Sequence, residues 1–203
     1  MEIYYIYINI LERERGKKNI YVYINMDYKL RKLTSVDLLN LEKIYNYLEL
    51  NPYCLRKSFE NYRKNNNYHA KKIGALDQPE ARGSTAGVVW KNGCFQISKL
   101  SKEHPILDDL LIDFMKVHNP EFNFNSVYIT KNCQSKPHKD SGNPDSSIIV
   151  TVGKFEGGGL YVKENELTTT LFDIKKNSLE FDGRKHTHFT EEFTGTRYSL
   201  IFY

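Results

Sequence analysis

Apolar and polar residues follow two different periods along this chain. From Ser126 onward, short runs of β-branched and aromatic residues alternate with glycine-, asparagine- and aspartate-containing turns, which predicts a series of strands. The runs are SVYIT (126–130), SSIIVTV (146–152), GLYV (159–162), TTLFDI (169–174), SLEF (178–181) and RYSLIFY (197–203). Their number and spacing favour a β sandwich or jelly roll.

Helical spacing dominates two earlier segments. Thr34 and Asp37 have the spacing of a capping box, and the apolar residues after them recur every three or four positions until Asn51. A second helix is predicted over about 104–117, with Pro105 in its first turn. We expect a mainly β protein of the α+β class, with the helices packed outside one sheet.

The N-terminal part contains two further candidate strands, YYIYINI (4–10) and NIYVYINM (19–26), separated by a charged turn. The polar stretch 57–72 combines lysine and arginine with Tyr62 and Tyr68. An exposed loop is the favoured interpretation of this stretch, and contact with a nucleic-acid strand is the alternative.

Length, charge and cysteine content narrow the possibilities. A chain of 203 residues is expected to form one domain, and its net charge of +4 suits an approach to polyanions without the dense basic blocks of a dedicated nucleic-acid binder. Its 3 cysteines lack C-x-x-C spacing, so a disulfide framework and a thiolate zinc site are not expected. No signal peptide or membrane span is recognised, and we expect an intracellular protein of the cytoplasm or nucleus.

The first candidate for chemistry is the segment KPHKDSGN, which contains His138 and Asp140. Residues two apart on an extended segment point to the same side, so an imidazole and a carboxylate can converge on one ion while Lys139 faces away. Such a triplet is weak evidence by itself, because a surface histidine beside a surface aspartate is common.

A second segment, FDGRKHTHFTEEFTGTRYSLIFY, supplies His186 and His188. One distant histidine added to His138 and Asp140 makes the facial triad of non-haem iron enzymes, which leaves three metal positions open. Two imidazoles and one carboxylate suit ferrous iron better than zinc, which usually has more histidine or cysteine ligands. The spacing alone leaves either histidine as the third ligand.

Arg197 and Ser199 lie two apart on the last predicted strand and share one of its faces. A guanidinium binds a carboxylate through two parallel hydrogen bonds, which suits the carboxylate of 2-oxoglutarate that does not bind the metal. By contrast, Gly157, Gly158 and Gly159 lack the context of a phosphate loop and are interpreted as a tight turn close to the site.

Three motifs together, PHKDSGN, FEGGGLYV and LEFDGRKHTHFTEEFTGTRYSL, resemble the double-stranded β-helix core of iron and 2-oxoglutarate dioxygenases. The similarity is greatest to the ten-eleven-translocation (TET) and base-J-binding (JBP) relatives and covers about Arg82 to the C-terminus. It implies Fe(II) and 2-oxoglutarate as cofactors, with ascorbate as an assisting reductant. Together with the length of the chain, it leads us to expect one dioxygenase domain over 1–203, with a catalytic core at 81–203. The strands and helix of 1–80, which the resemblance does not cover, are expected to support this core.

The resemblance assigns roles to particular residues. It implies that His138, Asp140 and His188 bind the iron, with His188 preferred over His186 from its distance to the F-T-G turn. It implies that Arg197 and Ser199 hold 2-oxoglutarate. The spacing H-x-D-x-x-N also places Asn143 where TET-like enzymes contact a flipped-out methylated base.

The expected function is therefore oxidation of a modified base, such as a 5-methylpyrimidine, in DNA or RNA, with dioxygen and 2-oxoglutarate as co-substrates. Tyr62, Tyr68, Trp90 and Lys139 are candidates for stabilising the extruded base. One alternative is a hydroxylase of a protein side chain or small molecule with the same iron chemistry. The other is a catalytically silent β-helix module that only binds a ligand.

Overall fold

The computed structural model describes residues 28–57, 80–140, 145–165 and 167–203. The predicted strands at 4–10 and 19–26, almost all of the polar stretch 57–72, and Asn143 lie outside these ranges.

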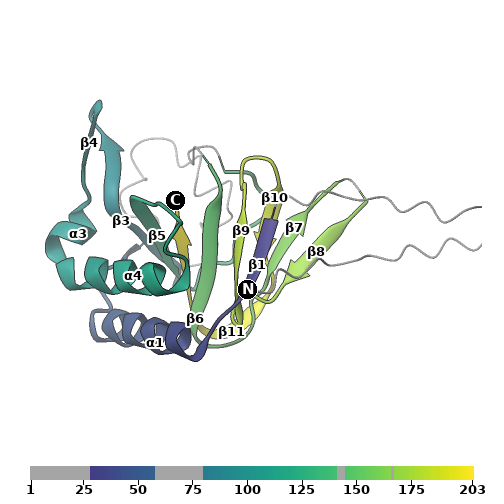
Figure 1. Ribbon diagram of the computed structural model, residues 1–203, viewed down its shortest axis with the longest axis horizontal. Helices are drawn as coiled ribbons and strands as arrows, with labels where there is room; N and C mark the ends of the chain where they lie inside the picture. Colours follow the sequence, from purple (N-terminus) through teal and green to yellow (C-terminus); the bar gives the residue numbers. More distant parts are fainter. Residues whose placement is uncertain (1–27, 58–79, 141–144, 166) are drawn as a thin grey trace, which may run out of the picture.

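Two antiparallel sheets form the body of the protein (Figure 1). The larger consists of β1 (Tyr28–Lys32), β2 (Arg56–Lys57), β3 (Arg82–Lys91), β4 (Cys94–Ile97), β5 (Ser126–Lys131), β6 (Ser147–Gly157), β9 (Asn177–Phe181) and β11 (Phe193–Phe202). Its order is β1-β9-β6-β11-β5-β3-β2, with β4 paired to β3. The smaller sheet consists of β7 (Leu160–Lys163), β8 (Thr169–Phe172) and β10 (Thr187–Thr190), in the order β10-β7-β8.

Strand β11 lies at the centre of the larger sheet, between β6 and β5. Ser199 is opposite Thr151 of β6 and Thr130 of β5. Because successive side chains of a strand point to opposite faces, Leu200 and Phe202 pack toward the helices while Arg197 and Ser199 point to the other side. The register of β11 therefore places both predicted 2-oxoglutarate residues inside the fold.

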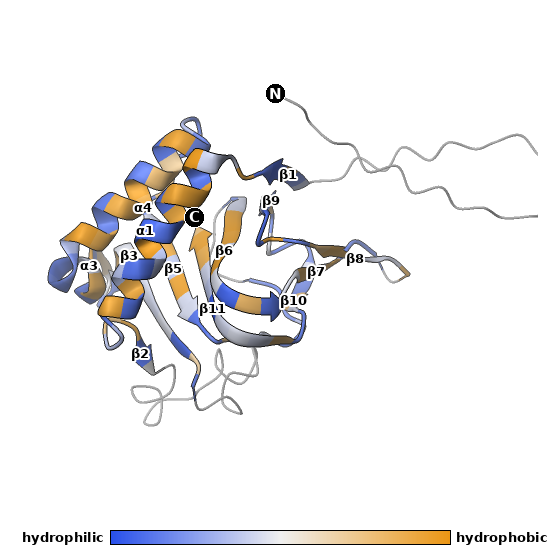
Figure 2. Cartoon of the chain, turned by 90° about the horizontal axis from the view of Figure 1, so that it is seen from below, coloured by the Kyte–Doolittle hydropathy of each residue, from blue (hydrophilic) through white to orange (hydrophobic). Residues whose placement is uncertain are grey.

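Helices α1 (Ser35–Leu50) and α4 (Pro105–His118) cover the outer face of the larger sheet, and the short helix α3 (Lys99–Glu103) precedes α4 (Figures 1 and 2). The predicted capping box is present. Thr34 Oγ1 accepts a hydrogen bond from the Asp37 amide at 3.1 Å, and the Thr34 amide donates to the Asp37 carboxylate at 2.8 Å.

The same Asp37 carboxylate links the helices to the sheet. Its Oδ2 lies 3.3 Å from Nδ1 of His118, the last residue of α4, and the other ring nitrogen of His118 is 2.6 Å from the Ser178 hydroxyl of β9. All three side chains are buried. Burial lowers the pKa of His118, although the Asp37 carboxylate opposes this effect. The contacts Asp37–His118–Ser178 thus link α1 and α4 to each other and to β9 of the sheet.

Apolar side chains form a separate core on each face of the larger sheet. The outer core joins Leu41 and Phe114 of the helices to Ile129 and Leu200 of the strands. The inner core lies between the two sheets, and its members are Ile149, Leu160, Val162, Phe172, Ile174, Leu179 and Phe181. The two sheets therefore enclose an interior of their own, as the interpretation as a double-stranded β-helix requires.

The predicted fold class, α+β and mainly β with helices on one sheet, is confirmed. Pattern reading did not predict the strands β1, β2, β3, β4 and β10 or the short helix α3. Strand β10 is THFT, in which the buried alternate positions are His188 and Thr190 rather than apolar residues, so its composition resembles that of a loop. The division of the chain at residue 80 stays a prediction. Strand β1 and helix α1, which precede residue 80, pack on the same sheet as the later strands.

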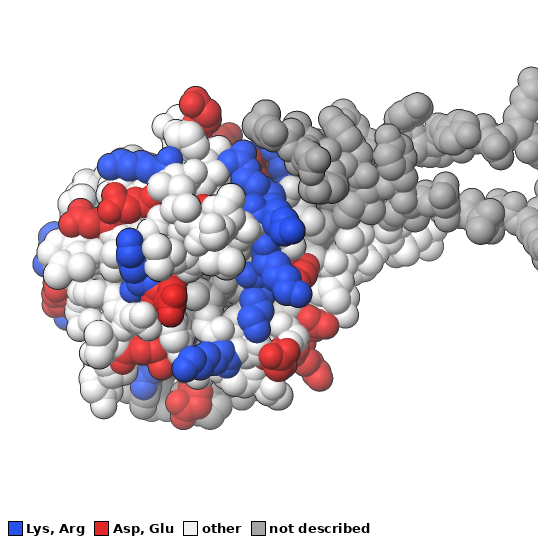
Figure 3. Space-filling view, turned by 60° about the horizontal axis from the view of Figure 1, so that its bottom comes forward, with Lys and Arg blue, Asp and Glu red and all other residues white. Residues whose placement is uncertain are grey.

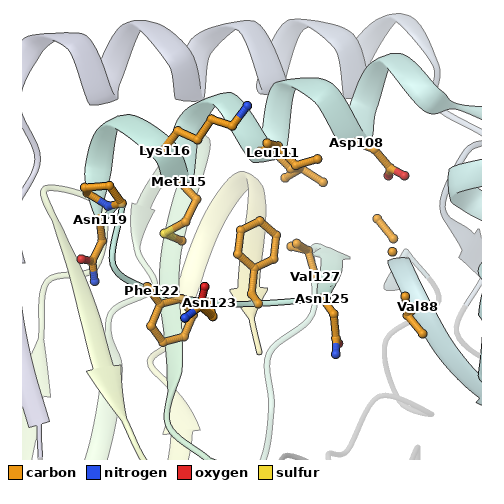
Figure 4. Close-up of a pocket in the computed structure, with 15 residues that line it drawn as sticks. Val88, Asp108, Leu111, Met115, Lys116, Asn119, Phe122, Asn123, Asn125 and Val127 are labelled. Atoms are coloured by element: carbon orange, nitrogen blue, oxygen red, sulfur yellow. The ribbon is translucent and has the colours of Figure 1, made fainter.

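A cavity of about 380 Å³ lies between α4 and the ends of β3 and β5 (Figure 4). Leu111 and Met115 of α4 face Val88, Val127 and Phe122 across it. This cavity is on the helix-covered side of the larger sheet, whereas Arg197 and Ser199 are on the opposite side. The sheet therefore separates the cavity from Arg197 and Ser199.

Among the described residues, α1 and α4 are the longest helices, and neither has the length and apolar character needed to cross a membrane.

Candidate metal centre

The two segments that contain the predicted ligands lie side by side. The His138 amide donates to the His188 carbonyl at 3.1 Å, and the His188 amide donates back to the His138 carbonyl at 2.9 Å. One step further, the Asp140 amide donates to the Gly183 carbonyl at 2.9 Å. These antiparallel hydrogen bonds bring residues about fifty positions apart in sequence to one place.

Three side chains converge where these segments meet. The candidate ligand atoms of His138, Asp140 and His188 lie within 4.8 Å of one another. Nε2 of His138 is 3.7 Å from one Asp140 carboxylate oxygen, and Nε2 of His188 is 3.8 Å from the other. We call these three residues the ligand cluster. They match the predicted set of two imidazoles and one carboxylate.

Backbone carbonyls orient both imidazoles of the ligand cluster. Nδ1 of His138 lies 2.7 Å from the Lys136 carbonyl, and Nδ1 of His188 lies 3.0 Å from the His186 carbonyl. A carbonyl only accepts hydrogen bonds, so each Nδ1 donates, and each Nε2 is the ring nitrogen that faces the Asp140 carboxylate. This arrangement is typical of metal-binding histidines, whose second nitrogen is fixed by a hydrogen-bond acceptor.

His186 takes a different place from His188. Its carbonyl positions the His188 ring, and its own Nε2 is buried without a hydrogen-bond partner among the described residues. The structure thus places His188 in the ligand cluster and His186 beside it. The sequence spacing alone allowed both, because residues two apart on an extended segment share a face.

Arg197 is buried deep between the sheets, with 1% of its surface exposed. Its Nε donates to the Gly158 carbonyl at 3.0 Å, and one terminal nitrogen donates to the Ser199 hydroxyl at 2.7 Å. The other terminal nitrogen, NH2, has no hydrogen-bond partner among the described residues. Burial lowers the pKa of Arg197 to about 10, so the side chain keeps its charge at neutral pH.

A buried, charged guanidinium whose NH2 nitrogen has no partner for its two N–H groups is costly unless an anion completes the hydrogen bonding. The distal carboxylate of 2-oxoglutarate is such an anion, and the Ser199 hydroxyl lies next to the same position. The donor set of the ligand cluster and the incomplete hydrogen bonding of Arg197 therefore both fit the expected metal and co-substrate.

Residues not recognised in the sequence hold Arg197 in place. The Asn132 side chain accepts from the Arg197 amide at 2.9 Å, and the Asn132 amide donates to the Arg197 carbonyl at 2.8 Å. Gly158 has a φ of +75°, and a Cβ there would lie 2.8 Å from Nε of Arg197. The three-glycine turn is thus close to the site, as interpreted from the sequence, and its middle residue leaves room for the guanidinium.

Cys133, which precedes the ligand cluster in the chain, is also buried near Arg197. Burial raises the pKa of its thiol to about 11, although the charge of Arg197 opposes this effect. The group is therefore a neutral thiol at neutral pH and not an activated nucleophile. All 3 cysteines are free thiols.

Of the candidates for base contact, the structure describes Trp90 and Lys139. Tyr62, Tyr68 and Asn143 lie outside the described residues. Trp90 is 64% exposed on the β3–β4 hairpin, where it packs edge-on against Phe95. Trp90 shares its hairpin face with Val88, which lines the cavity under α4, so we do not place it at the ligand cluster.

Comparison with solved structures shows the fold. NgTET1 in complex with 5mC DNA has a TM-score of 0.51 at 14% identity, over 87% of this chain and 71% of that one. A prolyl hydroxylase from Trichoplax adhaerens, in complex with a peptide of hypoxia inducible factor, also has a TM-score of 0.51, at 15% identity over 87% and 83%. A Pseudomonas putida prolyl-4-hydroxylase has a TM-score of 0.54 at 10% identity, over 88% and 93%.

No family model and no curated protein sequence matches the chain. The similarity to solved structures, at these identities, defines the class of fold. The chain has the double-stranded β-helix fold that is found in iron and 2-oxoglutarate oxygenases, and these include enzymes whose complexes contain DNA or a peptide.

Gly183 yields a first prediction about the metal site. A Cβ at this position would lie 2.5 Å from an Asp140 carboxylate oxygen and 3.3 Å from the His188 ring. Gly183→Ala is therefore expected to displace the carboxylate and to weaken cobalt(II) binding about 10- to 100-fold, the range for residues that orient a metal ligand. The measurement is a titration that follows the visible absorption of bound cobalt.

Gly93→Ala is the matched control for this titration. Gly93 lies in the β3–β4 turn, where a Cβ meets nothing within 4 Å; its φ of +79° strains an alanine, but the strain is confined to this turn, away from the ligand cluster. The control is expected to bind cobalt like the wild-type chain, and an equal loss in both variants would show that Gly183 has no particular effect on Asp140.

Proposed function

We propose that this chain is an Fe(II)- and 2-oxoglutarate-dependent dioxygenase. The observation that carries the proposal is the combination of the ligand cluster with a buried Arg197 whose NH2 group lacks a partner among the described residues. A protein that only binds a ligand on its surface has no need of either feature, so the catalytically silent module is disfavoured.

In this proposal His138, Asp140 and His188 hold the iron. Ferrous iron together with 2-oxoglutarate supplies the activation of dioxygen that oxidises a C–H bond of the substrate. The carbonyls of Lys136 and His186 keep both Nε2 lone pairs available by accepting from the Nδ1 protons. The chain thus provides an anionic and two neutral ligands in fixed orientations.

Arg197 and Ser199 bind the co-substrate in this proposal. The NH2 group of Arg197 donates to the distal carboxylate, and the Ser199 hydroxyl provides a second hydrogen bond. The aromatic rings of Phe155 and Phe193 lie 5.8 and 5.3 Å from the guanidinium carbon and help to exclude water from it. Exclusion of water strengthens the attraction between guanidinium and carboxylate.

For the substrate, we propose a modified base of nucleic acid, such as a 5-methylpyrimidine. The support is the H-x-D-x-x-N spacing of His138, Asp140 and Asn143, the net positive charge, and the similarity of the fold to NgTET1. Hydroxylation of a protein side chain is the second candidate, because two prolyl hydroxylases match the fold equally well.

Mass spectrometry tests both candidates in one experiment. The chain is incubated with Fe(II), ascorbate and 2-oxoglutarate, together with 5-methylcytosine-containing DNA or RNA, or with a library of proline-containing peptides. We expect oxidised nucleosides and a matching amount of succinate. Hydroxylated peptides without oxidised nucleosides would identify the protein hydroxylase instead.

Asn143→Ala separates substrate contact from oxygen chemistry. If Asn143 contacts the base, this variant is expected to form succinate in the absence of substrate while base oxidation falls at least about tenfold, as expected for a lost hydrogen bond to a buried group. Both rates are measured on the same preparation. An equal fall of the two rates would contradict a role limited to the base.

A further inference from the structure

The turn between β9 and β10 supplies backbone carbonyls to two members of the ligand cluster. It spans residues 182–186, and we call it the ligand turn. The Gly183 carbonyl accepts from the Asp140 amide at 2.9 Å, and the His186 carbonyl lies 3.0 Å from Nδ1 of His188. The shape of the ligand turn therefore determines how one carboxylate and one imidazole of the ligand cluster are held.

Asp182 closes the ligand turn at its first position. Its carboxylate accepts from the Arg184 amide at 2.9 Å, and its carbonyl accepts from the amides of Lys185 and His186, each at 3.2 Å. An aspartate that accepts from the amide two residues later is a common way to fix a turn. The Asp182 side chain is only 12% exposed, so little water competes for this hydrogen bond. Asp182 thus accepts from three successive amides.

The charged side chains of the ligand turn contribute less to its shape. Nε of Arg184 and Nζ of Lys185 each lie 3.7 Å from the Asp182 carboxylate, but these side chains are 46% and 62% exposed. Ion pairs at such exposure contribute little, because water and salt screen them. Burial opposes ionisation of the Asp182 carboxyl, yet its pKa is lowered, chiefly by the hydrogen bond from the Arg184 amide. This hydrogen bond is therefore the side-chain contact that we expect to fix the turn.

The chain contains the same kind of turn a second time. FDIKKNS (172–178) repeats the pattern of FDGRKHT (181–187). The Asp173 carboxylate accepts from the Lys175 amide at 3.0 Å, which is the same hydrogen bond to the amide two residues later. We call residues 173–176 the matching turn. It precedes β9, whereas the ligand turn follows that strand.

In both turns the residue after the aspartate presents its carbonyl to another segment. In the matching turn the Ile174 carbonyl accepts from the Thr151 amide at 3.0 Å. In the ligand turn the Gly183 carbonyl accepts from the Asp140 amide. The recurrence indicates that an aspartate-closed turn sets the direction of the next carbonyl. Of the two, the ligand turn is the one whose carbonyl meets a member of the ligand cluster.

We propose that Asp182 is a positioning residue of the metal centre, because it fixes the turn whose carbonyls orient Asp140 and His188. This inference rests on the proposed function, since it concerns the same ligand cluster. Asp182 is not itself a member of that cluster. Without its carboxylate the Arg184 amide loses its acceptor, and the turn loses the contact that directs both carbonyls. The loss therefore reaches the metal through the orientation of two ligands.

Cobalt(II) titration of Asp182 variants tests this role. Asp182→Ala removes the acceptor and is expected to bind cobalt about 10- to 100-fold more weakly than the wild-type chain, the range for residues that orient a metal ligand. The visible absorption of its bound cobalt is expected to change in position or intensity, because the ligands no longer hold their orientations. Asp182→Asn keeps an oxygen that accepts from the Arg184 amide and loses only the exposed ion pairs, so we expect an affinity within about threefold of the wild type.

A third variant keeps the test open if Asp182→Ala does not fold. The hydroxyl of Asp182→Ser accepts from a nearby amide more weakly than a carboxylate does. Its cobalt affinity is therefore expected to lie between those of Asp182→Asn and Asp182→Ala, and below that of the wild type. An affinity equal to that of the wild type would contradict the proposal.

Asp173→Ala is the matched control. Asp173 makes the same hydrogen bond in the matching turn, its side chain is 53% exposed, and β9 separates it from Phe181, whose ring packs edge-on against His188. In Figure 3, acidic side chains are scattered among Lys and Arg over the face shown, so the loss of one exposed carboxylate is a small change in surface charge. We expect this variant to bind cobalt within about twofold of the wild type.

Thermal melting of the metal-free chains separates positioning from folding. Asp182→Ala and Asp173→Ala each lose one hydrogen bond to a turn amide, so both are expected to melt at a lower temperature than the wild type. Only Asp182→Ala is expected to lose cobalt affinity as well. Wild-type affinity and absorption in Asp182→Ala, or an equal loss of affinity in Asp173→Ala or Asp182→Asn, would overturn the proposal. Absence of cobalt binding by the wild-type chain would instead overturn the ligand cluster itself, and this inference with it.

Discussion

Asp140→Ala is expected to abolish succinate formation and to lower metal affinity by more than about 100-fold, beyond the usual effect of residues that only orient a ligand. The carboxylate is the one anionic member of the ligand cluster, and its two oxygens face the two imidazoles at 3.7 and 3.8 Å. Without it, two neutral nitrogens remain, which hold ferrous iron weakly. Succinate release and cobalt titration measure the two effects separately.

Asp145→Ala is the control for this experiment. Asp145 is exposed a few residues further along the chain, and its loss changes the net charge by the same amount. We expect it to keep wild-type metal affinity. Turnover that survives in Asp140→Ala would remove Asp140 from the metal site and, with it, the proposed iron chemistry.

Arg197→Met is expected to raise the dissociation constant for 2-oxoglutarate about 10- to 150-fold, because a hydrogen bond between charged groups contributes about 1.5–3 kcal/mol. Methionine is apolar and flexible and fits the buried volume between Phe155 and Phe193. Since NH2 of Arg197 has no partner among the described residues, the variant leaves few protein groups unsatisfied and is expected to fold. Calorimetric titration of the metal-loaded chain gives the affinity.

Two further variants sharpen the interpretation of Arg197. Arg197→Lys keeps the charge but loses the planar fork, so its affinity for 2-oxoglutarate is expected to lie between those of the wild type and the methionine variant. Arg56→Met, at an exposed position of β2, is expected to bind 2-oxoglutarate normally. If Arg197→Met binds 2-oxoglutarate as tightly as the wild type, Arg197 does not hold the co-substrate.

The sequence by itself determined the elements whose signals are local. The capping box of Thr34 and Asp37 and the apolar period after it predict α1, and alternation predicts β5, β6 and β11, because neighbours in sequence decide these patterns. The identities of the candidate ligands and of Arg197 follow in the same way, since few residue types can bind iron or a carboxylate.

Tertiary structure alone decided which of these residues meet. The spacing alone allowed His186 and His188, and only the family resemblance favoured His188; the backbone hydrogen bonds between His138 and His188 place the His188 ring in the ligand cluster. The need for glycine at 158 and 183 depends on the space left beside Arg197 and Asp140. Strand β10 could not be predicted from its sequence for the same reason. Its buried positions, His188 and Thr190, are polar, and the burial of His188 is understood only from its place in the ligand cluster.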